Sequence, residues 1–271
     1  MRFEPFLRKL EVAEPLSPSE RHAALQVCVD VRLAKRRSDI VADDAVPDRV
    51  YIILSGWAAR YKILRDGSRR ITAFMLPGDF SDIDAAVLQR TDHGISAITD
   101  CEVAHVPVDR MEAFATATPR IMRAMRRATV VDASIVRQWL AVAARRSALE
   151  TTAHLFAELH ARLDALGRVA QGQTEFPLTQ EELGDATGMT VIHANRTLRE
   201  LRERGLMTLG KGRLYVPDVK ALGKAGGFDP RYLHFSKPAL PTVTPKRSTA
   251  DAFASTPVRP NPIWVVSEPR V

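Results

Sequence analysis

The stretch from residue 179 to residue 201 constrains the fold most, because it contains two helix starts separated by a glycine turn. Thr179 followed three residues later by Glu182 is a capping box, which marks the start of a first helix. Gly188 ends that helix, since glycine adopts positive φ without steric cost. Thr190 is a second N-cap. It precedes a helix with an apolar face, formed by Ala194, Leu198 and Leu201.

Two short helices joined by a tight turn are typical of a unit that places its second helix in a DNA major groove. The helix after Thr190 has a polar and basic face opposite its apolar one. Residues 206–216 then read as strand, glycine-bounded turn and strand, which predicts a wing with basic residues near its tip. A fragment of a two-helix bundle with no nucleic-acid role is the alternative interpretation. The candidate DNA contacts are Thr179, Thr190, Val191, Ile192, His193, Asn195, Arg196, Arg199, Lys211 and Arg213.

Composition narrows the class of protein. The formal charge of +7 suits a partner with phosphates. The two cysteines, Cys28 and Cys101, supply neither a disulfide framework nor a metal quartet, which fits a reducing compartment. No apolar run is long enough for a bilayer and the N-terminus is not a signal peptide, so a cytoplasmic protein without membrane contact is expected. The sequence has no nucleophile–base motif, phosphate loop or metal-ligand cluster, which argues against an enzyme.

The N-terminal part changes from a helical to an alternating pattern. Residues 1–33 look mostly helical. From there to about Pro107, short β-rich runs are separated by turn signals such as Asp66-Gly67. Many short strands at regular spacing predict a small antiparallel barrel or jelly roll, so the chain is expected to be an α+β protein. The expected strands cover residues 50–54, 58–63, 70–75, 94–98 and 102–106.

The order of these motifs resembles the Crp–Fnr family of bacterial transcription regulators. Residues 51–56, 66–67, 76–80 and 99–103 are similar to the cyclic-nucleotide-binding-type β-roll of that family, and residues 176–216 to its winged helix-turn-helix. The resemblance implies a homodimer that binds double-stranded DNA at a palindromic operator and contacts RNA polymerase. A ligand-binding or scaffold protein whose winged helix contacts protein is the alternative.

The family's base-contacting arginine is matched by Arg196, which suits a bidentate contact with guanine. Val191 and Ile192 stand where better-known members have an arginine and a glutamate. Apolar side chains meet thymine methyl groups but cannot read guanine or cytosine. The operator is therefore expected to differ from that of the cyclic-AMP receptor.

The family's nucleotide anchors are missing from the roll. Members that bind a cyclic nucleotide use a Gly-Glu pair after the Pro-Gly-Asp turn and a later Arg-Ser/Thr-Ala stretch, where this chain has Asp82-Ile83 and Thr91-Asp92. Carboxylates at these positions would repel a phosphate. We therefore expect neither a cyclic nucleotide nor an iron–sulfur cluster, which needs four thiolates. Solvated loop charge is preferred over a metal site at Asp82, Asp84 and His93. The candidate effector residues are Asp82, Ile83, Thr91, Asp92 and Asp132.

One long helix is expected after the roll. Thr118 and Pro119 supply its N-cap and first turn. Spacings of four and three give a heptad-like seam, and the resemblance assigns this helix to dimerisation. Asp132 interrupts the seam: either it fixes register or contacts a ligand, or Val131 takes its place and Asp132 faces water. The seam consists of Ile121, Met125, Ala128, Asp132, Ile135, Trp139 and Val142.

A second capping box, formed by Ser147 and Glu150, starts a new helix and places a hinge near residues 145–147. After Asp218 prolines recur without a hydrophobic period, so the tail is expected to be disordered. Its basic residues either add sequence-independent DNA affinity or are merely solvated. The expected domains are a sensor roll (1–117), a dimerisation helix (118–146), a winged helix-turn-helix (147–220) and a proline-rich basic tail (221–271).

Overall fold

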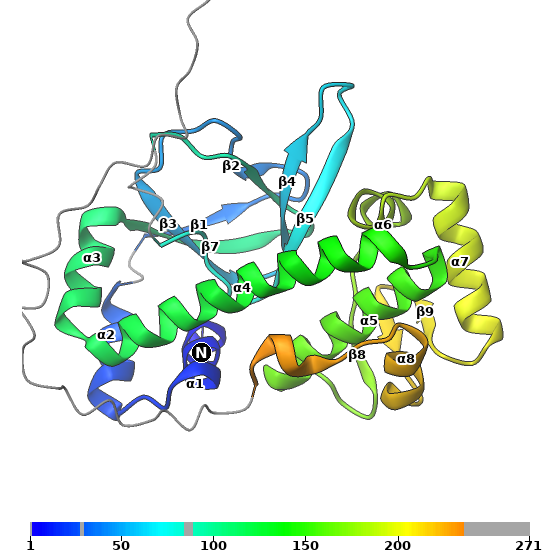
Figure 1. Cartoon of the computed structure of the whole chain (residues 1–271). Coiled ribbons are helices and arrows are strands. Elements are labelled where there is room, and N and C mark those ends of the chain that lie inside the picture. Colours follow the sequence, from blue (N-terminus) through cyan, green and yellow to red (C-terminus); the bar gives the residue numbers. More distant parts are fainter. Residues whose placement is uncertain (1, 28–29, 84–88, 236–271) are drawn as a thin grey trace, which may run out of the picture. The chain divides into compact units, whose positions relative to one another are not determined.

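The computed structural model describes residues 2–27, 30–83 and 89–235, and Figure 1 shows their elements. A β-roll is followed by one long helix, and then by shorter helices with a small sheet. The α+β architecture that the sequence predicts is confirmed. None of the helices within the described ranges is long and apolar enough to cross a membrane.

The roll has two antiparallel sheets, with strand orders β1-β7-β3 and β2-β6-β4-β5. All five predicted strands form, and β3 pairs with β7 so that Ile52 lies opposite Ala104. β1 and β2 were not predicted. β1 includes residues that the sequence pattern assigned to helix. The strand buries no continuous face and leaves Leu33 58% exposed, so its sequence lacks the alternating apolar pattern that predicts a strand. The strands are β1 (Asp30–Ala34), β2 (Asp39–Val41), β3 (Arg49–Ser55), β4 (Ala58–Ile63), β5 (Arg69–Met75), β6 (Gly94–Ala97) and β7 (Cys101–Pro107).

Three short helices flank the roll: α1 (Glu4–Ala13), α2 (Pro18–Val27) and α3 (Val108–Ala117). The apolar side of α1 is buried through Phe6 and Leu10, in one cluster with residues of β3 and of the following helix. Packing of an amphipathic face, rather than intrinsic propensity, stabilises helices this short. The N-terminal helices therefore join the roll to the long helix.

The long helix α4 (Pro119–Arg145) begins and ends where the sequence predicts. Its start differs in detail, because the Thr118 hydroxyl donates to the Phe114 carbonyl at 2.5 Å instead of capping the helix. The residues predicted to form the dimerisation seam are not the residues that α4 exposes. Five seam residues are buried against the chain's own core, namely Ile121, Met125, Ala128, Ile135 and Val142.

The apolar surface that α4 leaves exposed is a different face. Leu140 is 73% exposed and Val136 is 44% exposed. Together with the exposed Ala133 and Ala143 they follow spacings of three, four and three. We call Ala133, Val136, Leu140 and Ala143 the α4 stripe. Asp132 points instead to the roll, where its carboxylate lies 3.5 Å from the guanidinium of Arg60.

The winged helix follows the hinge that the sequence predicts. The capping boxes of α5 (Ala148–Ala165) and α6 (Gln180–Thr187) are both formed. Gly188 has a φ of +76°, the left-handed conformation that ends α6, before α7 (Val191–Glu203). The predicted wing strands pair with an unpredicted third strand. The small sheet consists of β8 (Gln173–Glu175), β9 (Thr208–Gly210) and β10 (Arg213–Tyr215).

The expectation of a disordered tail is wrong for residues 221–235. Asp218 caps α8 (Val219–Ala225) through the amides of residues 220 and 221, and Leu222 is fully buried. A short 3-10 helix, η2 (Pro230–Leu233), follows and buries Leu233. The rest of the predicted tail, residues 236–271, lies outside the described ranges.

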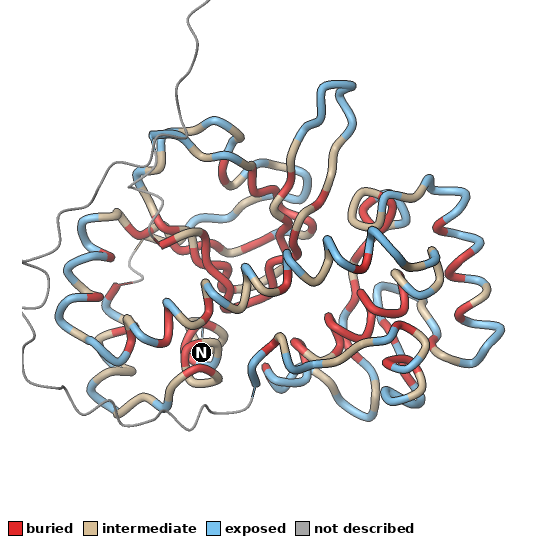
Figure 2. The backbone as a smooth tube through the Cα atoms, viewed as in Figure 1, coloured by how far each residue is buried: buried red, intermediate tan, exposed pale blue. Residues whose placement is uncertain are grey.

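One hydrophobic cluster extends from the roll into the winged helix. Trp57 and Phe74 of the roll belong to the same core as Phe156 of α5 and Phe176. The Trp57 and Phe176 rings meet edge to face with centroids 5.8 Å apart. In Figure 2 buried positions follow α5 along most of its length, which accords with its packing on both sides. At the predicted boundary one helix ends and the next begins, but the hydrophobic core continues across it.

Candidate nucleic-acid interface

Helix α7 separates a buried face from an exposed one. Ala194, Thr197, Leu198 and Leu201 are buried. No side-chain hydrogen bond within the described part of the chain engages Asn195, Arg196 or Arg199. The predicted readout residues are all exposed: Val191, Ile192, His193, Asn195, Arg196 and Arg199. Ile192 is 83% exposed, so this face is available to a partner.

The two helix starts fix the orientation of the helix-turn-helix. The Thr179 side chain accepts from the Glu182 amide at 3.2 Å, and the Glu182 carboxylate accepts from the Thr179 amide at 2.6 Å. The Thr190 hydroxyl accepts from the His193 amide at 3.3 Å. Because the Thr179 amide is engaged internally, the start of α7 is the better placed of the two to bind a phosphate.

The wing presents two exposed cations beside a tight turn. Lys211 and Gly212 both have positive φ, at 50° and 71°, which is the conformation of a two-residue hairpin turn. Leu214 of β10 is buried and anchors the hairpin, while Lys211 and Arg213 are exposed. Cations at a loop tip suit contacts with phosphate groups.

The roll contacts the helix-turn-helix directly, which sequence reasoning missed. The Arg69 guanidinium donates to the Asp185 carboxylate of α6 at 2.8 Å. A Cβ atom at Gly188 would lie 2.6 Å from the Arg70 guanidinium, so Arg70 packs over the turn itself. Partly exposed ion pairs contribute little to stability, and we interpret these contacts as orienting ones. Single arginines in a strand give no sequence signal for such a role.

An open cavity of about 520 Å³ lies between the roll and α4. Its floor includes Arg60 of β4, whose guanidinium donates to the Phe80 carbonyl at 3.1 Å and lies 3.5 Å from Asp82 and from Asp132. The Arg60 Nε atom is buried without a hydrogen-bond partner among the described residues. Sequence reasoning missed Arg60, because only the pairing of the strands brings it under α4. The ionisable side chains that line it are Arg60, Lys62, Asp82, Asp92, His93, Asp132 and Arg137.

Three of the five candidate effector residues line this cavity: Asp82, Asp92 and Asp132. Ile83 does not, because it is only 7% exposed and packs in the core. Thr91 lines a smaller neighbouring cavity, where its hydroxyl bonds to backbone groups. A hydrogen bond with His93 lowers the pKa of Asp92, which keeps this carboxylate charged. The cavity therefore combines cationic and anionic groups.

The alternative metal site receives no support from the described residues. Among residues 2–27, 30–83 and 89–235, no cluster of three or more His, Cys, Asp or Glu side chains could hold a metal ion. Asp84 and Cys28 lie outside these ranges. Cys101 is buried, and burial raises the pKa of its thiol to about 11, so the thiol stays protonated.

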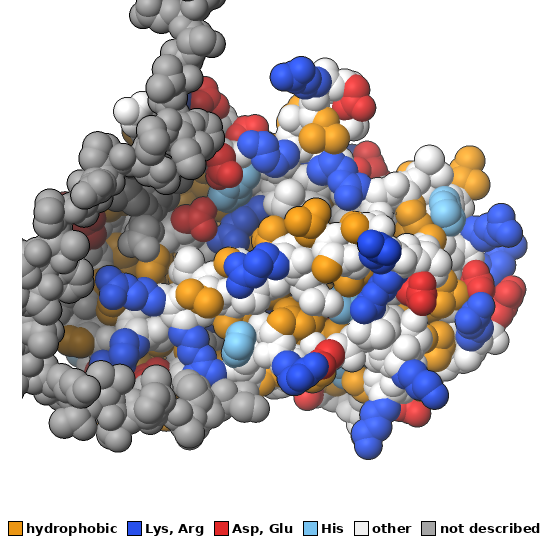
Figure 3. Space-filling model, in the orientation of Figure 1, with side chains coloured by type: hydrophobic (Ala, Val, Ile, Leu, Met, Phe, Trp, Pro, Cys, Tyr) orange, Lys and Arg blue, Asp and Glu red, His pale blue; other side chains and the backbone are white. Residues whose placement is uncertain are grey.

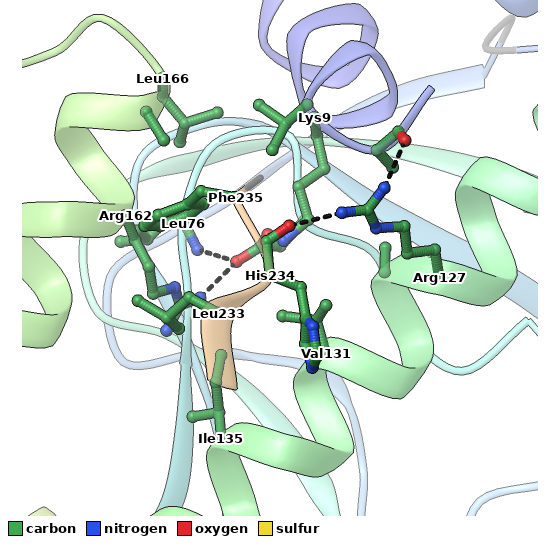
Figure 4. A pocket seen from close by; sticks show the side chains of 15 residues that line it. Lys9, Leu76, Arg127, Val131, Ile135, Arg162, Leu166, Leu233, His234 and Phe235 are labelled. Atoms are coloured by element: carbon green, nitrogen blue, oxygen red, sulfur yellow. Dashed lines mark hydrogen bonds and ion pairs between the residues drawn. The ribbon is translucent and has the colours of Figure 1, made fainter. Parts of the chain in front are cut away.

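A buried ion network connects the roll to α5 (Figure 4). Asp79, in the Pro-Gly-Asp turn, pairs with Lys9 at 2.5 Å and with Arg162 at 2.9 Å. Burial alone would raise the pKa of Asp79, but the charges of Lys9 and Arg162 outweigh it and lower that pKa. Arg162 also lies 3.4 Å from Glu158, whose pKa is raised by burial. These four groups fix α5 against the roll.

The fold and this interface define a class: regulators with an N-terminal β-roll and a C-terminal winged helix-turn-helix. Two domain families match the sequence, a cyclic nucleotide-binding domain over residues 31–117 and a Crp-like helix-turn-helix domain over residues 152–225. The nitrogen fixation regulation protein FixK of Bradyrhizobium diazoefficiens is 28% identical over 190 residues, which are 69% of this chain and 78% of FixK. The transcriptional activatory protein AadR of Rhodopseudomonas palustris is 26% identical over 215 residues, 79% of this chain and 88% of AadR.

Solved structures show the same fold. FixK2 from Bradyrhizobium japonicum superposes with a TM-score of 0.64 at 23% identity, covering 72% of this chain and 96% of FixK2. A CooA mutant from Carboxydothermus hydrogenoformans superposes with a TM-score of 0.60 at 15% identity, covering 79% and 92% of the two chains. The chain belongs to the Crp/Fnr family, and it is a transcription regulator with a DNA-binding helix-turn-helix rather than an enzyme.

Proposed function

We propose that the protein is a homodimeric regulator that binds a palindromic operator through α7 and the wing. The observation that carries this proposal is the division of α7, whose inner face is locked in the shared core while its outer face is exposed. Two such helices on a two-fold axis would read half-sites one helical turn apart. Such a complex would work in the cytoplasm, where it would also meet RNA polymerase.

The α4 stripe supports the dimer. It is an exposed apolar face with heptad spacing on a helix of 27 residues, about 40 Å long. Figure 3 shows hydrophobic side chains (orange) exposed along α4, between basic side chains (blue). A face of this kind is stabilised when the same face of a second copy covers it.

Selection of bound duplexes from a random DNA pool tests the proposal, followed by affinity measurements on the selected sequence. Arg196→Ala should weaken binding to the selected duplex by about 1–3 kcal/mol and leave binding to random duplex nearly unchanged, because a base contact carries specificity. Arg202→Ala is a matched control, since Arg202 is exposed on the same helix near its C-terminal end. Equal losses on both duplexes would make Arg196 a phosphate contact only.

Salt dependence separates DNA binding from protein docking. Binding that neutralises phosphates weakens steeply as salt rises, because counterions are released. A pool that yields no enriched sequence, together with affinity that does not respond to salt, would contradict the proposal and favour a winged helix that contacts protein.

We propose further that the cavity beside Arg60 receives the effector. Its mixed lining suits a ligand that presents an anionic group to Arg60 and hydrogen-bond donors to Asp82 and Asp132. The carboxylates oppose a cyclic phosphate, so calorimetry should detect no micromolar binding of cyclic AMP. Micromolar binding would overturn this assignment of ligand class.

A further inference from the structure

Residues 226–235, which we call the C-terminal segment, run from the junction between α4 and α5 along these two helices (orange in Figure 1). Gly226 rests on the backbone of α5, where a Cβ atom would lie 2.3 Å from the His154 amide nitrogen. No side chain fits in that space. The segment then turns into η2, where the Asp229 carboxylate accepts from the Arg231 amide at 3.0 Å. The start of the segment is therefore in direct backbone contact with α5.

The segment is bonded to the junction itself. Arg146 immediately follows α4, and its guanidinium donates to the carbonyls of Gly226 and Gly227, the second at 3.1 Å. Because α5 begins at Ala148, Arg146 occupies the turn about which the two helices would rotate. A change in the angle between α4 and α5 therefore acts on these bonds first.

Tyr232 joins the segment to both helices. Its hydroxyl donates to the Glu158 carboxylate of α5 at 2.7 Å, and the indole of Trp139 in α4 donates to the same oxygen at 2.9 Å. The Tyr232 ring is stacked on His154, with centroids 6.0 Å apart and planes 11° from parallel. Glu158 is completely buried, so this oxygen has no access to water as a substitute partner.

The other end of the segment is attached to the first half of α4. Arg127 donates to the His234 carbonyl at 2.6 Å and to the Ala13 carbonyl of α1 at 2.9 Å, as Figure 4 shows. Leu233 is buried beside Val131. The segment therefore contacts α4 well before the junction, the junction, and α5 after it.

We propose that the C-terminal segment is a clasp that holds α5 at one angle to α4 and thereby sets the position of α7. α5 packs against both α6 and α7, so a rotation at Arg146 would carry the helix-turn-helix with it. The segment is attached to α4 through Arg127 and to α5 through Tyr232, so such a rotation requires one of these attachments to open. Release of the clasp is the local event that frees the winged helix to reorient.

Hydrogen exchange on the DNA-free protein tests the clasp without relying on the proposed function. Tyr232→Phe keeps the aromatic ring beside His154 and removes the hydroxyl, with its hydrogen bonds to Glu158 at 2.7 Å and to His154 Nε2 at 3.1 Å. Amides of residues 145–150 should exchange about tenfold faster, since a lost hydrogen bond to a charged group is worth about a tenfold change in the opening equilibrium. Amides of β3 and β7 should be unchanged. Arg231→Ala is the control, because that side chain is 90% exposed and pairs only with Asp229 among the described residues.

Truncation provides a second test, which does rest on the proposed function. Ending the chain after Ala225 should lower affinity for the selected duplex several-fold relative to a chain that ends after Phe235, although α7 and the wing are intact in both. Equal affinity and equal exchange at residues 145–150 in the two chains would overturn the clasp. So would faster exchange in Tyr232→Phe spread evenly over the roll, which would indicate a loss of global stability only.

Discussion

At the scale of single residues, the buried charged side chains between the roll and α5 depend on one another, so that removal of one takes a partner from another. Glu158 is completely buried and accepts from Trp139 and Tyr232 while facing Arg162. Arg162 also pairs with Asp79 and donates to the Phe74 carbonyl, so the loss of Glu158 or Asp79 leaves this buried cation with one carboxylate instead of two. Removal of one partner from a buried network costs more than the pair contributes as a whole.

We expect Glu158→Ala to lower the free energy of unfolding by about 3–5 kcal/mol, because the Trp139 indole loses its acceptor and the Tyr232 phenol and the Arg162 guanidinium each lose one partner. Denaturant titration measures the change. Glu112→Ala is the control, since Glu112 is exposed on α3, and it should stay within about 0.5 kcal/mol of the wild type. A change below about 1 kcal/mol in Glu158→Ala would show that Glu158 is not important for folding.

His154 should make stability depend on pH. Burial lowers the pKa of His154 to about 4, whereas the unfolded chain has an ordinary value near 6.5. Between these two pH values the unfolded chain binds a proton at His154 that the folded chain does not. The contribution of buried His154 to the free energy of unfolding is therefore complete above about pH 6.5 and is lost as the pH falls toward 4. The slope is about 1.4 kcal/mol per pH unit.

The difference in unfolding free energy between the wild type and His154→Gln isolates this effect, because other groups titrate in both proteins. Chemical denaturation at pH 7, 6 and 5 should show the difference shrinking or reversing as pH falls. A difference that stays constant over this range would mean that the pKa of His154 is the same in the folded and the unfolded protein.

At the scale of elements, α4 shows why a periodic pattern does not identify a partner. The predicted seam and the α4 stripe both have heptad spacing. The first part of the seam packs with α1 and the roll, and its last part, at Trp139 and Val142, lies beside α5 and α6. The α4 stripe remains exposed, with Leu140 at 73% and Val136 at 44%. The same helix therefore contributes one face to the core and leaves another exposed, where we propose that a second copy packs.

We expect Leu140→Glu to convert the dimer into a monomer, because two carboxylates would face each other across the two-fold axis. Val130→Glu is the matched control: Val130 is an exposed apolar residue of α4 but lies about 90° around the helix from the α4 stripe. Light scattering at micromolar concentration measures the mass. If both variants remain dimeric, the interface lies elsewhere.

At the scale of the whole molecule, the shared hydrophobic cluster couples the roll to the winged helix. Phe176 contacts Trp57 on one side and Phe156 on the other, with centroids 5.8 and 4.7 Å away. A core that spans both parts favours a single cooperative transition. Phe176→Ala should therefore lower stability by about 3–5 kcal/mol and keep one transition. Calorimetry and far-UV circular dichroism would contradict this if they resolved two separate unfolding steps.

Much of this organisation could be predicted from sequence, because its signals are local. The caps at Thr179 and Ser147 and the turn at Gly188 need only neighbouring residues, and all three are formed. The contacts of Arg60 and Arg69 join residues far apart in the chain, so no local sequence pattern predicts them. The helices within residues 219–235 were not predicted for the same reason. They are short and are stabilised by packing on α5, so their own sequence has no clear helical period.

The outer face of α7 contributes no bond to the folding of its own chain. No side-chain hydrogen bond or ion pair within the described residues engages Asn195, Arg196 or Arg199, and Ile192 is mostly in solvent. Surface substitutions of this kind usually change stability by less than about 0.5 kcal/mol. Over generations, such a regulator can acquire new target genes through changes on this face, without first having to gain spare stability.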